Sequence, residues 1–192
     1  MNRLIQGIKL LLLLTITVSS VTHASDMIKP KITTLDTFNV VGIQVTGSPS
    51  DGSFGQTWPA LFARHHEVKN DTGMQTSYGI QSYSETSLKT GIWEYTAGLE
   101  TKMQQPLPKG MTLIEVPANQ YAVFVYKGAV GPKLGELFRA IYQQWLPTSG
   151  YALAGSYDFE KYDERFKGPQ NPDSILEIYI PIKKIPPLPK LP

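Results

Sequence analysis

Apolar and polar residues alternate along several short segments of the chain, and this period of two is typical of β-strands with one buried face. The clearest case lies near the C-terminus, where apolar residues occupy every second position from Leu176 to Ile182. Glu177 and Tyr179 then belong to the opposite face of that strand. Strand-like segments are expected at residues 32–46, 77–82, 91–99, 111–115, 121–126, 151–156 and 175–182.

Two segments carry apolar residues at helical spacing instead. The first helix is expected near residues 54–66, with Pro59 in its first turn, where a missing backbone N–H is tolerated. The second opens at Gly131-Pro132 and is stopped by Pro147. The apolar faces consist of Phe54, Trp58, Leu61 and Phe62 in the first helix and of Leu134, Leu137, Phe138, Ile141, Tyr142 and Trp145 in the second.

The order strand, helix, strand, strand occurs once in each half of the chain. Neither half can bury its apolar helix face alone, so the two halves are expected to pack into one domain. The expected fold class is α+β: two β-α-β-β units related by a pseudo-two-fold axis, a mostly antiparallel sheet, two main helices on one side and a central groove. Aligning the halves places Trp93 over Glu177 and Tyr95 over Tyr179, which predicts that these four side chains line the groove.

The segment Phe159-Glu160-Lys161-Tyr162 adds a second acidic group among aromatic residues. A carboxylate beside aromatic rings suits a hydrophobic cation, because the rings offer apolar contact and a negative π-face while the carboxylate supplies the counter-charge. Each acid also has an ordinary alternative. Glu177 would lie on a solvated strand face, and Glu160 would lie in a surface loop at residues 158–167, paired with Lys161 or Arg165.

The two ends of the chain differ in composition from the middle. Residues 1–24 have the features of a secretory signal peptide, with Arg3 and Lys9 at the front and a short apolar core at residues 10–18. The mature protein is therefore expected to be periplasmic or secreted, without stable membrane insertion; an uncleaved anchor is the alternative. Residues 185–192 form a proline-rich tail, interpreted as an exposed extended segment or, alternatively, as a docking peptide.

Charge and residue counts argue against several function classes. The chain has 18 Lys and Arg against 16 Asp and Glu, and without Arg3 and Lys9 of the leader the two counts are equal. A neutral chain without a basic stripe argues against nucleic acid as a partner. The chain has no Cys, and outside the leader only the adjacent His65 and His66 remain, which argues against a metal site. No phosphate loop or nucleophile elbow occurs, so no cofactor is expected.

An ordered set of motifs runs along the chain, formed by residues 58–62, Tyr78-Gly79, residues 95–98, 116–124 and 141–147, Phe159-Glu160-Lys161-Tyr162 and residues 177–182. This set resembles the GyrI-like proteins, which include the effector-binding domains of AraC- and MerR-type regulators. The similarity covers about residues 30–184, and the corresponding domain is expected at residues 25–184.

The resemblance implies a groove that binds amphipathic, often cationic, small molecules against aromatic walls and a partly buried glutamate. The family glutamate falls on Glu160, and the glutamate of the terminal strand falls on Glu177. Some family members are hydrolases, so the alternative to binding alone is Glu160 as general base or nucleophile with Tyr121 or Tyr162 as proton donor. The candidate ligand-binding residues are Glu160, Trp93, Tyr95, Glu177, Tyr179, Tyr162, Tyr121 and Trp58.

The chain departs from the regulator members of that family at its N-terminal end. The leader leaves only a few residues before the first strand, too few for a DNA-binding domain. The expectation is therefore a stand-alone exported sensor, scavenger or enzyme whose partner is a small molecule.

Overall fold

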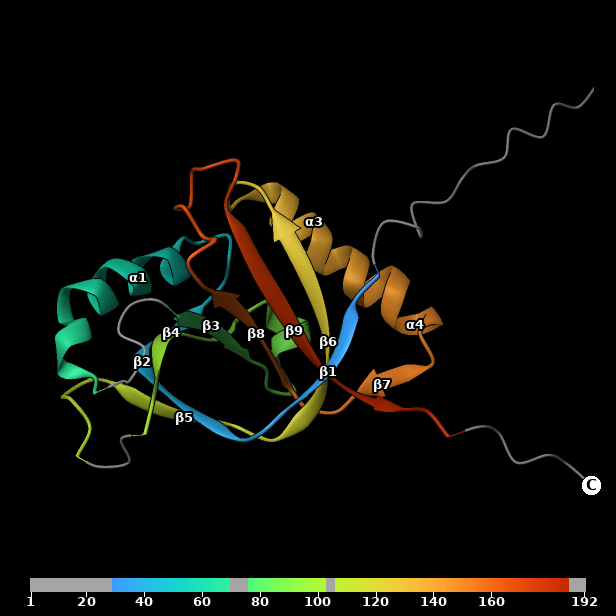
Figure 1. Cartoon of the computed structure of the whole chain (residues 1–192), viewed down its shortest axis with the longest axis horizontal. Helices are drawn as coiled ribbons and strands as arrows, with labels where there is room; N and C mark the ends of the chain where they lie inside the picture. Colours follow the sequence, from blue (N-terminus) through green and yellow to red (C-terminus); the bar gives the residue numbers. More distant parts are fainter. Residues whose placement is uncertain (1–28, 70–75, 103–105, 187–192) are drawn as a thin grey trace, which may run out of the picture.

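The computed structural model describes residues 29–69, 76–102 and 106–186. These residues form one antiparallel sheet with the strand order β1-β6-β9-β8-β3-β4-β2-β5, and the short strand β7 pairs with β9 (Figure 1). The sheet curls into a half-barrel, and the two main helices, α1 and α3, pack against one of its faces. The α+β fold class and the antiparallel sheet expected from the sequence are confirmed.

The elements follow the chain in an order that repeats. The first unit is β2-α1-β3-β4, and the second is β6-α3-β8-β9. The strands are β1 Lys31–Leu35, β2 Phe38–Gly47, β3 Ser77–Ser82, β4 Trp93–Thr101, β5 Thr112–Val116, β6 Asn119–Lys127, β7 Tyr151–Leu153, β8 Tyr157–Tyr162 and β9 Ile175–Lys184. The helices are α1 Ser53–Arg64, α2 Ser87–Thr90, α3 Pro132–Ala140 and α4 Leu146–Thr148, with a 3-10 turn at His65–Glu67 and a π-helical turn at Ile141–Trp145.

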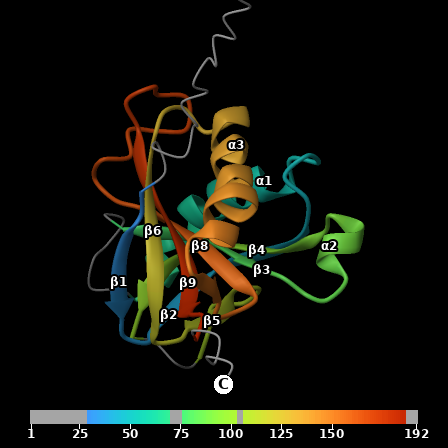
Figure 2. The same ribbon diagram turned by 90° about the vertical axis from the view of Figure 1, so that its right-hand side faces the viewer.

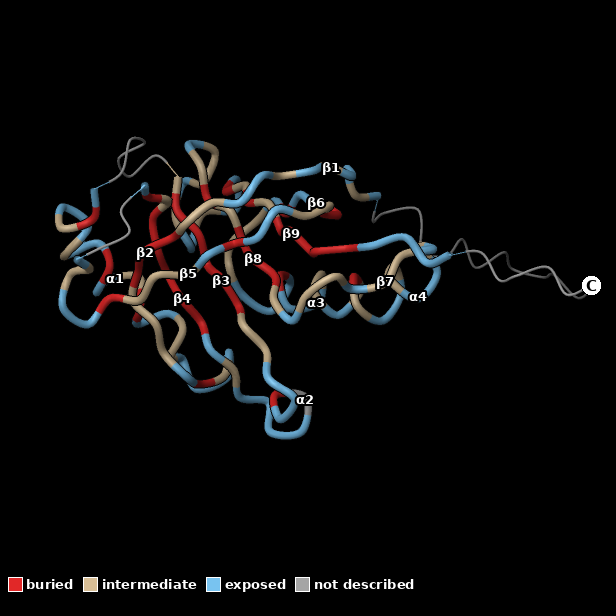
Figure 3. Tube along the Cα trace, turned by 90° about the horizontal axis from the view of Figure 1, so that it is seen from below, coloured by how far each residue is buried: buried red, intermediate tan, exposed pale blue. Residues whose placement is uncertain are grey.

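The two units meet at the centre of the sheet, where β3 and β8 lie side by side in antiparallel register. Gly79 is opposite Glu160, and Ile80 is opposite Phe159. Residues at the centre of a sheet have strands on both sides and layers above and below, so their side chains become deeply buried. Figure 3 shows this as buried stretches along β3, β4, β8 and β9, whereas α2 is largely exposed.

The described residues form three apolar clusters, two on the helix-covered face of the sheet and one on the opposite face. On the face covered by helices, Leu61 of α1 packs with Val41 and Leu99, while Leu134 of α3 packs with Ile178 and its strand neighbours. The opposite face carries the third cluster, which neither α1 nor α3 covers. Its buried members are Val40, Tyr78, Ile80, Val116, Tyr121, Val123, Phe159 and Tyr179.

Three expectations about local structure were wrong. The single strand expected at residues 32–46 is two strands, and β1 pairs with β6 of the second unit. The alternative that placed residues 158–167 in a surface loop was wrong for residues 158–162, which lie in the central strand β8. Helix α1 begins at Ser53, so Pro59 lies in the helix interior rather than in its first turn.

The expected signal peptide lies outside the described residues, as does the end of the expected proline-rich tail at residues 187–192. In the described ranges, no helix is both long and apolar enough to cross a membrane.

Candidate functional site

Strand β8 places acidic and aromatic side chains on the face of the sheet that the helices cover. Successive side chains of a strand point to opposite faces, so Asp158, Glu160 and Tyr162 share one face while Phe159 points to the other. Because β8 is central, both acids are buried: Asp158 is 0% exposed and Glu160 is 6% exposed. A deeply buried acid is unusual without a positive partner, which makes this strand the centre of the candidate site.

Glu160 is held by the hydroxyl groups of two tyrosines. Tyr162 donates a hydrogen bond of 2.7 Å and Tyr95 one of 3.3 Å, both to Oε2 of Glu160. The indole N–H of Trp58 in turn donates to the hydroxyl of Tyr95 at 3.1 Å. Among the described residues no hydrogen-bond donor reaches the other carboxylate oxygen, Oε1. Oε2 of this buried carboxylate therefore has two hydrogen-bond donors, whereas Oε1 can still accept a hydrogen bond from a further partner.

Aromatic rings from helix α1 and strand β4 surround this pair of tyrosines. The ring of Phe54 stacks on Tyr95 with centroids 4.7 Å apart, and Trp58 meets Tyr162 edge-on at 4.9 Å. Phe62, one turn further along α1, contacts Trp58 at 5.8 Å and is 47% exposed. The site thus runs from a buried carboxylate to an exposed ring along one side of α1.

The absence of a side chain at position 79 makes room for this arrangement. A Cβ atom on Gly79 would lie 2.3 Å from the hydroxyl oxygen of Tyr95 and 2.7 Å from Oε2 of Glu160. Both distances are shorter than real carbon–oxygen contacts, so a larger residue would push the two side chains apart. Glycine at this position is required by close packing and not by a left-handed backbone.

We expect Gly79→Ala to lower the free energy of unfolding by about 1–3 kcal/mol, because the new methyl group overpacks the contact between Tyr95 and Glu160. Denaturant unfolding followed by circular dichroism measures this change. Gly55→Ala is the matched control, since a Cβ there meets no atom within 4 Å. In that helical position alanine should raise stability by up to about 1 kcal/mol. Equal effects of the two substitutions would contradict the packing role of Gly79.

Asp158 forms a second buried network two residues before Glu160. Its carboxylate accepts hydrogen bonds from Gln81 at 3.0 Å, from Tyr83 at 2.9 Å, and from the hydroxyl of Tyr142. Trp93 joins the network by donating its indole N–H to Oε1 of Gln81 at 3.1 Å. All of these donors are neutral groups, so they satisfy the hydrogen-bond acceptors of Asp158 without neutralising its charge.

Sequence reasoning missed the residues of this second network other than Trp93. The signal that could have revealed Asp158 was the alternation of Asp158, Glu160 and Tyr162, which has the period of a strand. Gln81, Tyr83 and Tyr142 come from three different elements or loops, and the pattern of the sequence does not show that they converge.

Burial makes both acids weaker than usual. It raises the pKa of Asp158 to about 6, although the hydrogen bonds from Tyr142, Tyr83 and Gln81 oppose the shift. It raises the pKa of Glu160 to about 7, opposed by Tyr162 and Tyr95 and reinforced by the charge of Asp158. Within residues 29–69, 76–102 and 106–186, no Lys or Arg forms an ion pair with either acid. The site therefore favours any positive charge that can reach it.

The tyrosines remain hydroxyl donors throughout the physiological pH range. Burial and the charge of Glu160 raise the pKa of Tyr95 and of Tyr162 well above that of a free tyrosine. Both hydroxyl groups therefore keep their protons and continue to donate to the carboxylate.

Glu177 and Tyr179, which were expected in the same groove, lie on the other face of the sheet. The register explains this, because Glu160 pairs with Ile178, and the neighbours of Ile178 on β9 must point the opposite way. Tyr179 stacks on Phe159 with centroids 4.6 Å apart and an interplanar angle of 10°. Trp93 and Tyr95 do lie on the face of Glu160, so the expectation that all four side chains line one groove was wrong.

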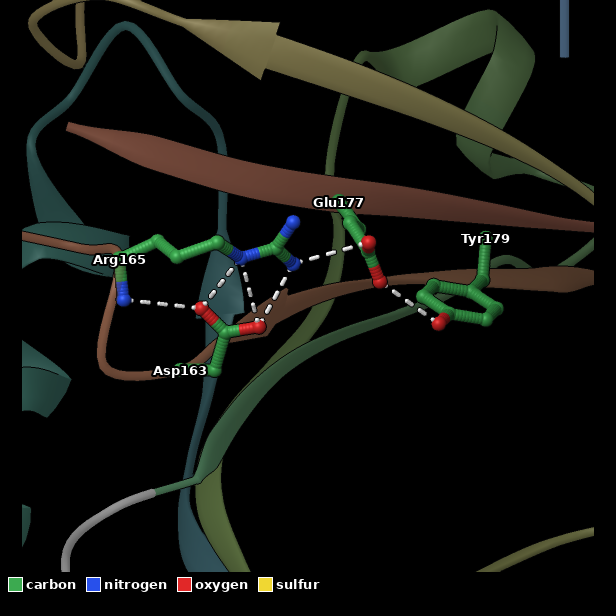
Figure 4. A network of polar contacts seen from close by, with 4 residues as sticks. All are labelled: Asp163, Arg165, Glu177 and Tyr179. Atoms are coloured by element: carbon green, nitrogen blue, oxygen red, sulfur yellow. Dashed lines mark hydrogen bonds and ion pairs between the residues drawn. The ribbon is translucent and has the colours of Figure 1, made fainter. Parts of the chain in front are cut away.

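Glu177 also differs from Glu160 in its partners, as Figure 4 shows. Arg165 approaches Glu177 at 2.9 Å and Asp163 at 2.6 Å, and Tyr179 donates to Glu177 at 2.8 Å. Partial burial raises the pKa of Glu177, but the hydrogen bonds from Arg165 and Tyr179 outweigh it and leave the pKa lowered. The negative charge of Glu177 is thus paired with the positive charge of Arg165, and this ion pair links the loop after β8 to strand β9.

Tyr121 is likewise remote from Glu160. Its hydroxyl donates to the carbonyl oxygen of Pro117 at 2.9 Å and lies 2.7 Å from the hydroxyl of Tyr157, on the face opposite to the helices. Of the two tyrosines considered as the proton donor of a hydrolase, only Tyr162 contacts Glu160.

No group of three or more His, Asp or Glu side chains in the described ranges is arranged to hold a metal ion. His65 and His66 are exposed at the end of α1, where Nδ1 of His65 lies 2.7 Å from the carbonyl oxygen of Phe62.

A family model described as integron-associated effector binding protein, Cass2, matches residues 31–182. This match covers both β-α-β-β units. The chain belongs to the Cass2 family of effector-binding proteins. The GyrI-like resemblance noted in the sequence is thereby confirmed, and small-molecule binding is the function of this family.

Individual relatives of this Cass2-family protein agree with that assignment. The transcriptional regulator BrlR of Pseudomonas aeruginosa is 39% identical over 145 residues, which are 76% of this chain and 52% of the regulator. The chain thus spans about half the length of that relative. The structure of SAV2435 bound to tetraphenylphosphonium has a TM-score of 0.64 at 17% identity and covers 81% of this chain and 94% of its own. The integron cassette protein VCH_CASS2 of Vibrio cholerae has a TM-score of 0.57 at 18% identity, with 81% and 97% covered. At these identities the two structures establish the shared fold.

Proposed function

We propose that this protein binds a lipophilic organic cation on the helix-covered face of the sheet, with Glu160 as the counter-charge. The observation that carries the proposal is a carboxylate 6% exposed, with two phenol donors on one oxygen, none on the other, and no ion pair within the described residues. An ionised acid in such a place is unfavourable by itself, because the protein replaces its hydration shell with only two neutral hydrogen bonds. A bound cation removes that penalty.

The surroundings of Glu160 determine which cations fit. Trp58, Phe54 and Tyr162 supply flat apolar surfaces and negative π-faces around the acid. A strongly hydrated cation such as Lys-type ammonium gains little from these rings, whereas a cation with a delocalised or shielded charge and aromatic arms contacts them over a large area. The rings and the carboxylate of Glu160 together therefore favour a ligand that is both aromatic and positively charged.

One structural neighbour supports the ligand class. SAV2435 shares the fold and has been determined with tetraphenylphosphonium, a cation whose charge is shielded by four aromatic arms. We propose the same chemical class for the present chain on the strength of its own buried acid and rings.

The test is a titration of the protein with tetraphenylphosphonium and, in parallel, with the neutral compound triphenylphosphine oxide, followed by calorimetry. We expect saturable binding of the cation at one site beside Glu160 and an affinity at least tenfold above that of the neutral compound, because only the cation interacts with the charge of Glu160. Equal affinities for the two compounds would contradict the role of the carboxylate.

A second function, hydrolysis of a small electrophile, is favoured by one observation. The hydroxyl of Tyr162 donates to Glu160 at 2.7 Å, and a carboxyl with a pKa of about 7 is suited to proton transfer near neutral pH. In that case Glu160 would activate water and Tyr162 would protonate the leaving oxygen. Incubation with styrene oxide distinguishes the two functions: diol formation that Tyr162→Phe abolishes indicates hydrolysis, and an unchanged epoxide indicates binding alone.

We propose further that binding takes place outside the cytoplasm and without nucleic acid. The signal-like leader at residues 1–24 and the neutral charge of the remaining chain are the grounds for this. N-terminal sequencing of the exported protein should begin near Ser25, and a gel-shift assay at physiological salt should give no retention of DNA.

A further inference from the structure

The side chain of Trp58 connects helix α1 to the residues around Glu160. Helix α1 shares one side of the sheet with α3 (Figure 2), and Trp58 packs against both apolar clusters of that side. Its ring meets Tyr162 edge-on at 4.9 Å, and its indole N–H donates to the hydroxyl of Tyr95 at 3.1 Å. Trp58 therefore contacts both tyrosines that donate to the carboxylate.

The chain of hydrogen bonds from Trp58 to Glu160 can run in one direction only. An indole N–H is a donor that cannot accept, so the oxygen of Tyr95 must be the acceptor in its contact with Trp58. Tyr95 has a single hydroxyl proton, which it donates to Oε2 of Glu160. A tyrosine hydroxyl without such a donor is free to rotate and to accept instead. Trp58 thus fixes Tyr95 as a donor to the carboxylate.

The hydrogen bond from Tyr95 to Glu160 is the weaker of the two and gains most from a donor behind it. Its length is 3.3 Å, against 2.7 Å for the bond from Tyr162. Hydrogen bonds between oxygen atoms are typically about 2.7–2.8 Å long. A donor to the phenol oxygen polarises the O–H group and strengthens the bond that this group donates. In agreement with this, burial and the charge of Glu160 raise the pKa of Tyr95, and the hydrogen bond from Trp58 opposes them.

We propose that Trp58 is a positioning residue for cation binding: by donating to Tyr95, it keeps the proton of Tyr95 on Oε2 of Glu160 and leaves Oε1 for the cation. The part of this inference that concerns the cation rests on the proposed function of Glu160. The hydrogen-bond chain is present without a ligand, so its effect on Glu160 is measurable in the unliganded protein. Trp58 then has two separable roles, apolar contact through its ring and control of the carboxylate through its N–H.

The titratable groups that surround Glu160 come mainly from the sheet. They are Tyr95 on β4, Tyr162 and Asp158 on β8, and Tyr83 in the loop after β3. From the helix layer, Tyr142 reaches Asp158, and the α1 side chains that contact the tyrosines, Phe54 and Trp58, are neutral. A substitution of Trp58 therefore changes the titration of Glu160 either through the hydroxyl of Tyr95 or through packing.

A double-mutant cycle in the unliganded protein separates these two routes. It consists of the unmodified chain, Trp58→Phe, Tyr95→Phe and the combination, and NMR titration of the Glu160 carboxyl carbon, assigned by its loss in Glu160→Gln, gives the pKa in each. Trp58→Phe should raise the pKa of Glu160 by about 0.3–0.6, because the donor to Oε2 is weakened. In the Tyr95→Phe background the same substitution should change it by less than about 0.1, because the hydroxyl that transmits the effect is already absent.

Trp145→Phe is the matched control. Trp145 lies on the same side of the sheet, but its ring contacts Phe124 and Tyr151 instead of the tyrosines beside Glu160. This substitution should leave the pKa of Glu160 unchanged. The inference is overturned if Trp58→Phe raises that pKa equally in both backgrounds, if it does not raise it in the unmodified background, or if Trp145→Phe has the same effect.

Calorimetric titration with tetraphenylphosphonium between pH 5.5 and pH 8.5 adds the ligand to the same test. In Trp58→Phe the pH midpoint of binding should rise by the same amount as the pKa of Glu160, whereas the affinity at the high-pH plateau should fall by less than about threefold, since a phenyl ring retains most of the apolar contact. A pKa that moves as expected without a matching change in the pH midpoint would confirm the hydrogen-bond chain and contradict the proposed function of Glu160. A pH midpoint that differs between Glu160→Gln and the unmodified protein but not in Trp58→Phe would overturn the role of Trp58 and leave that function intact.

Discussion

Glu160→Gln is expected to weaken the binding of tetraphenylphosphonium by about tenfold to a hundredfold, which corresponds to roughly 1.4–3 kcal/mol. Glutamine keeps the length and shape of the side chain, and its amide oxygen can still accept from Tyr162 and Tyr95. The substitution therefore removes the charge and preserves the packing. Affinity for triphenylphosphine oxide should change by less than threefold, because apolar contact with the rings is retained.

Glu177→Gln provides the matched control for this experiment. Glu177 also accepts from a tyrosine at 2.8 Å, but it lies on the opposite face of the sheet and is already paired with Arg165. Binding of tetraphenylphosphonium to Glu177→Gln should equal that of the unmodified protein. If the two variants lose affinity to the same extent, the effect comes from net charge and not from a site at Glu160. Loss of the neutral compound along with the cation in Glu160→Gln would point to disturbed packing instead.

Raising the pH from 5.5 to 8 is expected to strengthen tetraphenylphosphonium binding about sevenfold to twentyfold. The cation prefers the ionised form of Glu160, and with a pKa of about 7 only a small fraction of that carboxyl is ionised at pH 5.5. Affinity should rise by less than tenfold per pH unit between pH 5.5 and pH 7 and then level off. Calorimetric titrations at half-unit steps measure the curve, and in Glu160→Gln it should be nearly flat.

The stability of the unliganded protein should change with pH in the opposite direction. The folded-state pKa values of Asp158 and Glu160 are raised to about 6 and about 7, so the folded protein binds more protons than the unfolded chain between about pH 4 and pH 7. Stability therefore falls as pH rises through this window, by on the order of 3 kcal/mol for Glu160 alone. Weaker binding at pH 5.5 thus cannot be attributed to unfolding caused by these two groups, and a stability that rose with pH across the window would contradict their assignment.

Most of the fold could be predicted from the sequence because its elements have strong local patterns. The strand at residues 175–182 has a clean period of 2 and is present as expected. The helix after Gly131-Pro132 begins as expected, but it passes into a π-helical turn at Ile141–Trp145, and Pro147 lies inside α4 rather than ending the helix. Strand β8 was ambiguous because every one of its residues is polar or aromatic. A surface loop can have the same composition. Only its position between β3 and β9 buries it, and long-range pairing is not visible in the local pattern.

The site was predicted in part for a related reason. Glu160, Trp93, Tyr95, Tyr162 and Trp58 do lie on one face, which alternation and the family resemblance could indicate. The alignment of the two halves placed Trp93 and Tyr95 over residues that point to the opposite face of the sheet, because a shift by an odd number of residues in a strand moves every side chain to the other face. Glu177 and Tyr179 were misplaced for that reason.

Proton release on ligand binding shows whether Glu160 provides the negative charge for a bound cation. At pH 6.5 a carboxyl with a pKa of about 7 is protonated in about three quarters of the molecules, and cation binding must drive that proton off. Titrations with tetraphenylphosphonium in two buffers of different ionisation enthalpy give the number of protons released. We expect about 0.7 proton per cation for the unmodified protein and close to none for Glu160→Gln. Binding without proton release, or the same release from both proteins, would contradict it.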